Sequence, residues 1–330
     1  MKNTINKKLF IYFLFVYMIT AIYGLLMAVA GKRGLDTGAF SAALMFLPAS
    51  GVMLGNLLIP EAEEGGKSSP PKLFFLTFLA AAAFLAALAA GGMIARGEGM
   101  EEAANGLVGI CSAVLFFELL CLSGKKREEW GLVFSRSWKK GLVGIIIFIG
   151  LHLVWSVLTT LTVCFKDGNL HDFIWNIRPV QYLFLPIGFA LTYSGFLGEE
   201  YGWRYFLQPA LQEKFGIRKG ILLVGILWAV WHLPIDLFGG GFSFGLGCGF
   251  LIRLAGCMGK SIFTGWLYMR TKNIWAVAAV HFLNNNIAMM AVPAGLTTDW
   301  RNGLIIAVMY VAVYFPFLLL MRPAEGQLYH

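Results

Sequence analysis

Long apolar runs recur along this chain, and each is close to the length that a helix needs to cross a lipid bilayer. Charged residues make up 13% of the sequence, whereas a soluble domain carries ~25%. Inside a bilayer a spanning segment must satisfy its own backbone hydrogen bonds, and a helix does so. We therefore expect an all-α fold, a polytopic transmembrane helical bundle with about 8–10 spanning helices. The candidate runs are 9–30, 39–59, 73–95, 104–123, 141–164, 179–198, 218–237, 244–269, 273–294 and 303–321.

The net charge of +8 could indicate a nucleic-acid partner, but the positions of the basic residues favour a lipid bilayer. If the N-terminus is cytoplasmic, the predicted inner segments hold about three times as many Lys and Arg residues as the outer ones, in line with the positive-inside rule. Most of this bias comes from 124–140, which contains Lys125, Lys126 and Arg127. We expect a multi-pass protein of the cell membrane, with both termini in the cytoplasm, basic loops near anionic lipid headgroups, and no nucleic-acid partner.

The same basic loop divides the chain into two parts. We expect N-terminal transmembrane helices over 1–140 and a C-terminal transmembrane bundle over 141–330. The runs before the loop contain few polar groups, whereas nearly every run after residue 178 carries one. Candidate functional residues are therefore concentrated in the C-terminal part.

Two adjacent carboxylates, Glu199 and Glu200, follow directly after the apolar run 182–197. A charge at bilayer depth costs ~2.5–3.5 kcal/mol on insertion scales, so such residues usually face a cavity and act there. Consecutive residues on a helix diverge by ~100°, so only one of the two can point at a common centre. Arg204 is four residues after Glu200 and can pair with it. Glu200 and Arg204 are thus predicted to be structural, which leaves Glu199 free to face a cavity.

Polar side chains also interrupt two later apolar runs. Trp228 and His232 are four residues apart, as are His281 and Asn285, so each pair shares one helix face. An aromatic ring beside His232 would exclude water and position the imidazole. This pattern indicates that both helices present functional groups to the same interior.

The turn at 214–219 is basic and contains Gly216, which favours a helical hairpin at the cytoplasmic surface. Glu199 lies 16 residues before Phe215, and His232 lies 16 residues after Gly216. If both arms are helical, each residue is ~24 Å from the turn. The spacing therefore predicts that Glu199 and His232 lie at one depth and face each other.

The order EExxxR, aromatic-xxx-His and HxxxN resembles the CPBP family, which comprises CAAX proteases and bacteriocin-processing enzymes and is also called Abi. The matching segments read GEEYGWRYFLQPAL at 198–211, LWAVWHLP at 227–234 and HFLNN at 281–285. The resemblance covers about 185–290, with Trp228 standing where many members have Phe. It implies a glutamate-type intramembrane endopeptidase whose catalytic core lies in the C-terminal bundle.

The mechanism expected from these residues is hydrolysis of a peptide bond by water. Glu199, helped by His232, would act as general base. His281 and Asn285 would donate hydrogen bonds to the developing oxyanion. The substrate implied by the resemblance is a membrane-associated protein or peptide, either of CAAX type or a leader or signalling peptide, and no cofactor is expected.

Two alternatives remain open from the sequence. Glu199, His232 and His281 are also suitable ligands for Zn²⁺, and the chain would then be a zinc metalloprotease, although it lacks the HExxH pattern of zincins. Alternatively, the polar residues belong to a non-catalytic membrane protein, such as a bacteriocin immunity factor or a transporter.

Overall fold

The computed structural model describes residues 2–59, 68–95, 99–167, 182–239, 246–291 and 300–321. Within these ranges all regular secondary structure is helical, so the predicted all-α fold class is confirmed. The helices are α1 (Lys2–Lys32), α2 (Gly38–Leu58), α3 (Lys72–Ala95), α4 (Met100–Cys121), α5 (Gly124–Glu129), α6 (Trp138–Asp167), α9 (Leu185–Glu200), the π-helix η2 (Tyr201–Leu207), α10 (Gln208–Phe215), α11 (Ile217–Trp231), α12 (Leu233–Phe238), α13 (Leu246–Thr271), α14 (Ile274–Ala291) and α15 (Trp300–Leu319).

Six helical stretches of the described residues are long and apolar enough to cross a membrane. They correspond to α1, α2, α3, α4, α6 and the combined arm of α11 and α12, and a shorter apolar helix covers Gly303–Leu319. The other predicted runs also form helices, but these are short or carry the polar side chains described below. The protein is thus a multi-pass membrane protein.

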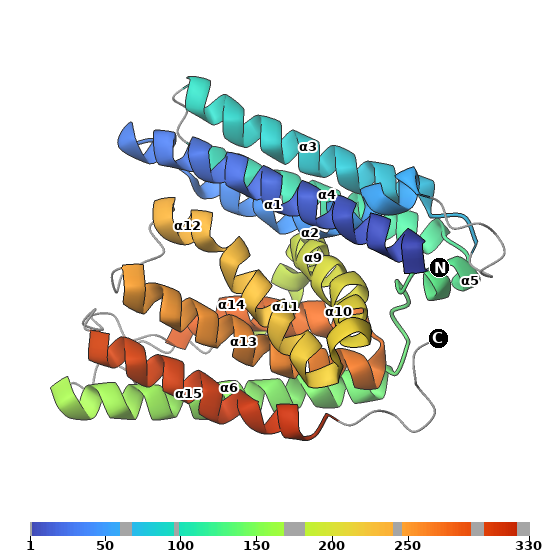
Figure 1. The fold of residues 1–330 in the computed structure, drawn as a ribbon. Coiled ribbons are helices and arrows are strands. Elements are labelled where there is room, and N and C mark those ends of the chain that lie inside the picture. Colours follow the sequence, from blue (N-terminus) through green and yellow to red (C-terminus); the bar gives the residue numbers. More distant parts are fainter. Residues whose placement is uncertain are drawn as a thin grey trace.

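The helices form two groups with a hairpin between them. Figure 1 shows α1 to α4 together on one side, α6, α13 and α15 on the other, and α9, α10 and α11 between them. Helix α2 packs against α9 and η2, α11 packs against α13, and α14 packs against α9 and α6. The hairpin that carries the predicted motifs is therefore enclosed by helices from both parts of the chain.

The contact between α2 and η2 is unusually close. A Cβ atom at Gly202 would lie 2.6 Å from the carbonyl carbon of Pro48, so no larger residue fits without a shift of the backbone. Single π-helical turns within α-helices occur frequently at functional sites. Here the π-helix follows directly after Glu199 and Glu200, and its close packing on α2 fixes the position of both carboxylates.

Candidate active site

The predicted hairpin is present in the structure. Helix α10 ends at Phe215, Gly216 adopts φ 85°, and α11 begins at Ile217. A positive φ is readily adopted by glycine, which explains why this residue forms the turn. Residues on the two sides of the turn consequently face each other.

Glu199 meets Trp228 across this hairpin. The indole Nε1 of Trp228 donates a hydrogen bond to Glu199 Oε2 over 2.8 Å, and both side chains are buried. Trp228 lies one helical turn before His232, so Glu199 is closer to the turn than the equal spacing suggested. The i→i+5 pattern of η2 places more residues in each turn, which shortens this arm relative to an α-helix of the same length. No hydrogen bond or ion pair joins Glu199 to His232 among the described residues.

Glu200 forms the predicted pair with Arg204. The distance from Arg204 Nε to Glu200 Oε2 is 2.8 Å, and both side chains are fully buried. The other carboxylate oxygen, Oε1, lies 2.8 Å from Nδ1 of His281 on α14. Arg204 also donates to Ser261 Oγ on α13 over 3.1 Å. Glu200 therefore joins the hairpin to α14, and its two oxygens are both engaged.

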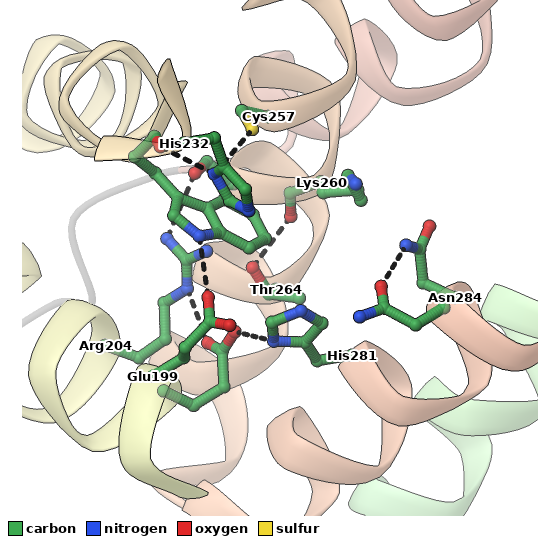
Figure 2. A network of polar contacts seen from close by, with 12 residues as sticks. Glu199, Arg204, His232, Cys257, Lys260, Thr264, His281 and Asn284 are labelled. Atoms are coloured by element: carbon green, nitrogen blue, oxygen red, sulfur yellow. Dashed lines mark hydrogen bonds and ion pairs between the residues drawn. The ribbon is translucent and has the colours of Figure 1, made fainter. Parts of the chain in front are cut away.

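The Trp228 ring is the centre of the cluster, since it contacts Arg204, Lys260 and His281, all labelled in Figure 2. The guanidinium carbon of Arg204 lies 5.1 Å from the ring centroid, and the ammonium nitrogen of Lys260 lies 5.4 Å from it. The ring of His281 meets it edge-on at 5.2 Å. Cations within ~6 Å of an indole are attracted by its quadrupole. Trp228 thus contacts the carboxylate with its edge and two cations with its ring.

His232 lies at the junction between α11 and α12. Its Nδ1 is 2.8 Å from the backbone oxygen of Trp228 and 4.0 Å from Cys257 Sγ. The ring of Trp231 meets it edge-on, with ring centroids 4.8 Å apart and an interplanar angle of 85°. Pro234 follows within the first turn of α12, where proline is tolerated. The imidazole is therefore held by its own helix and by aromatic neighbours, as expected.

Asn285 is not brought into the cluster. Its side chain is exposed, and its Oδ1 accepts a hydrogen bond from Nδ2 of the neighbouring Asn284 over 2.9 Å. Figure 2 shows Asn284 set apart from Glu199 and His232. His281 and Asn285 therefore share a helix but differ in burial, and only His281 contacts the carboxylates.

Sequence reasoning missed the contribution of α13. This helix presents Arg253, Cys257, Lys260, Ser261 and Thr264, whose spacings of three and four residues place them on one helix face. Arg253 forms two hydrogen bonds with the buried Asp236 of α12, at 2.8 Å through Nε and at 2.5 Å through its NH2 nitrogen. The signal in the sequence is the presence of two cations, Arg253 and Lys260, in the otherwise apolar run 244–269.

The described residues contain no group of three or more His, Cys, Asp or Glu side chains placed to hold a metal ion. All three ligands of the zinc alternative have other contacts in the cluster, since Glu199 binds Trp228, His281 Nδ1 faces Glu200 and His232 Nδ1 faces the backbone oxygen of Trp228.

The fold and the polar cluster together define a membrane protein with a buried carboxylate-histidine centre, and comparison with known proteins points to the membrane proteases. Residues 181–287 match the family model described as type II CAAX prenyl endopeptidase Rce1-like. The predicted resemblance to CAAX proteases is thus confirmed for the segment that includes α9, α11, α13 and most of α14.

One curated relative is CAAX prenyl protease 2 of Methanococcus maripaludis, which is 26% identical over 110 residues. The alignment covers 31% of this chain and 39% of the relative, so the chain spans less than half of that protein's length. No solved structure matches the chain.

Proposed function

We propose that this protein is an intramembrane endopeptidase that hydrolyses a peptide bond in a membrane-associated protein or peptide, of CAAX or leader type. The observation that carries the proposal is the buried Glu199, which is held by Trp228 at the centre of a cluster from α9, η2, α11, α13 and α14. This cluster lies in the segment that is similar to CAAX endopeptidases.

Glu199 is the better candidate for the general base of the two carboxylates. Glu200 has one oxygen near Arg204 and the other near His281. Glu199 accepts a hydrogen bond from Trp228 through Oε2, and among the described residues Oε1 has no such donor. A water molecule bound to Oε1 could transfer its proton to this carboxylate oxygen, as general base catalysis requires.

The proposed reaction begins when this water transfers a proton to Glu199 and its oxygen bonds to the carbonyl carbon of the substrate. The carbonyl π electrons move to the oxygen, which becomes an oxyanion. When the tetrahedral intermediate collapses, the C–N bond breaks and the leaving nitrogen takes the proton from Glu199. His232, one helical turn beyond Trp228, would help to position the water.

In this proposal His281 and Asn285 stabilise the oxyanion, but the geometry sets conditions on each. His281 Nδ1 faces Glu200, so the ring could donate from Nε2 only when both nitrogens are protonated. Asn285 accepts from Asn284 through Oδ1, so its Nδ2 would be the donor, but its side chain is exposed and forms no hydrogen bond with a carboxylate of the described residues. The proposal accordingly gives the main catalytic role to Glu199 and leaves the oxyanion donors to be tested.

The decisive experiment is Glu199→Gln, measured with purified protein in liposomes and a farnesylated peptide that ends in a CAAX sequence. Cleavage is expected to fall by about 10²–10⁴-fold, because an amide of the same shape cannot accept the proton. Glu118→Gln is the matched control, since Glu118 is an intramembrane carboxylate of α4 that binds Thr77 instead. Near wild-type turnover by folded Glu199→Gln protein would show that Glu199 is not the base.

The same assay separates an enzyme from a non-catalytic protein. A wild-type protein that cleaves neither this peptide nor a leader peptide, under conditions in which it stays folded, would favour the immunity or transporter alternative. A leader peptide cleaved in place of the prenylated one would keep the mechanism and change the substrate class.

A further inference from the structure

Lys260 is a cation of the site that the proposed mechanism does not use. It lies on α13, its side chain is partly buried, and its ammonium is 5.4 Å from the centre of the Trp228 ring. The N–H of the same ring binds Glu199. Figure 2 shows the Lys260 side chain above Thr264 and His281, so it borders the region around the proposed base.

The charges of the cluster leave Lys260 without a direct counter-ion. Arg204 pairs with Glu200, and Arg253 pairs with Asp236. Among the described residues no carboxylate lies within ion-pair distance of the Lys260 ammonium, and none accepts a hydrogen bond from it. Charged residues in membrane-spanning helices are rare and usually mark a functional site. We therefore expect the ammonium of Lys260 to interact with an anion that binds or forms during the reaction.

The proposed reaction supplies such an anion. Before the water attacks, the negative charge is on Glu199, and Glu199 and Lys260 both contact the indole of Trp228. When Glu199 takes the proton, it becomes neutral and the negative charge moves to the former carbonyl oxygen. A fixed cation beside the base then compensates the charge in its new position, and such preorganised compensation is often the largest single contribution to catalysis.

We propose that Lys260 is a further catalytic residue, whose ammonium donates a hydrogen bond to the oxyanion of the tetrahedral intermediate. This inference rests on the proposed function. Lysine carries three donors on a flexible stem, so it meets a requirement that His281 meets only when doubly protonated, whereas Asn285 is exposed. No covalent bond forms to Lys260, and it returns unchanged when the C–N bond breaks.

The competing explanation is structural, in which Lys260 only holds the Trp228 ring through its cation–π contact. Lys272 provides a control for this explanation, because its ammonium lies 5.4 Å from the centre of the Tyr268 ring and its side chain is also partly buried. Lys272 follows the end of α13 at Thr271, away from the polar cluster. The same substitution at the two lysines removes one cation–π contact in each case.

The test compares Lys260→Met, Lys260→Arg and Lys272→Met with wild-type protein in liposomes, with the farnesylated CAAX peptide as probe. Lys260→Met is expected to lower kcat by about 100-fold with little change in KM, because it removes one oxyanion donor. Lys260→Arg keeps the charge and is expected to retain most of kcat. Lys272→Met should behave as wild type. Lys260→Gln, which keeps polarity without charge, provides a second neutral variant if the Met protein is unstable.

Wild-type kcat in a folded neutral variant of Lys260 would overturn the role of Lys260 and leave the proposed function intact. Equal losses in Lys260→Met and Lys260→Arg, with a lower Tm in both, would assign the residue to packing and would also overturn it. If wild-type protein itself cleaves no peptide while Glu199→Gln behaves identically, the proposed function fails and this inference fails with it.

Discussion

The N-terminal and C-terminal helices both bury polar side chains, but they arrange them differently. In α1 to α4 the polar contacts join neighbouring helices two residues at a time. Lys8 donates to Asn56 over 2.8 Å, and Thr77 donates to Glu118 over 2.6 Å. Ser112 of α4 donates to Ser194 of α9 over 2.9 Å. These contacts are distributed along the helices and do not converge.

The C-terminal helices direct their polar groups to one centre. Glu200 alone contacts both Arg204 of η2 and His281 of α14, and Trp228 of α11 contacts residues from four other helical segments. Contacts between two residues hold helices together in a bilayer, where no hydrophobic effect drives helix association. A shared network that also contains an unpaired carboxylate and an unpaired ammonium has more charge than packing requires. The difference separates structural polar groups from functional ones.

Glu200→Gln tests this distinction with the largest expected effect on stability. The substitution leaves Arg204 without its charged partner in a fully buried position, and breaking such a pair costs about 3–5 kcal/mol. We expect a clearly lower Tm in detergent and a poor yield. A stable Glu200→Gln protein together with an aggregating Glu199→Gln protein would mean that the two carboxylates have opposite roles to those proposed.

Ser112→Ala tests the other side of the comparison and should have a small effect. It removes the contact with Ser194, and interhelical hydrogen bonds in membranes average about 0.6 kcal/mol. The Tm should fall slightly, and the cleavage rate should stay at the wild-type level. A large loss of activity would show that the N-terminal contacts take part in the site, so the division between the two regions would be wrong.

The sequence predicted the features that depend on local spacing. Apolar runs predicted the helices, the four-residue spacing predicted the pair of Glu200 and Arg204, and the basic turn at Gly216 predicted the hairpin. Each of these follows from the geometry of one helix or one turn. Such features need no knowledge of how distant segments pack.

The features that were missed depend on packing between helices. The π-helix η2, which packs closely on α2 at Gly202, brings Glu199 level with Trp228 instead of His232. The cations of α13, Arg253 and Lys260, can be assigned to the site only when α13 is known to pack against α11. Asn285 shares a helix with His281 but is exposed. The four-residue spacing between them does not distinguish a buried position from an exposed one.

Removal of metal ions should have the smallest effect of all and bears on what holds the C-terminal network together. Its polar side chains contact one another directly, through Trp228 on Glu199 and through Glu200 on Arg204 and His281. If these contacts are sufficient, activity in EDTA or 1,10-phenanthroline should stay within about twofold of the untreated protein, because general base catalysis by a carboxylate needs no metal. Metal analysis of the purified protein should then find no stoichiometric zinc.

Full inhibition that added Zn²⁺ reverses would instead make Glu199, His232 and His281 metal ligands, with the metal activating the water. The rings would then have to turn, since His281 Nδ1 now faces Glu200.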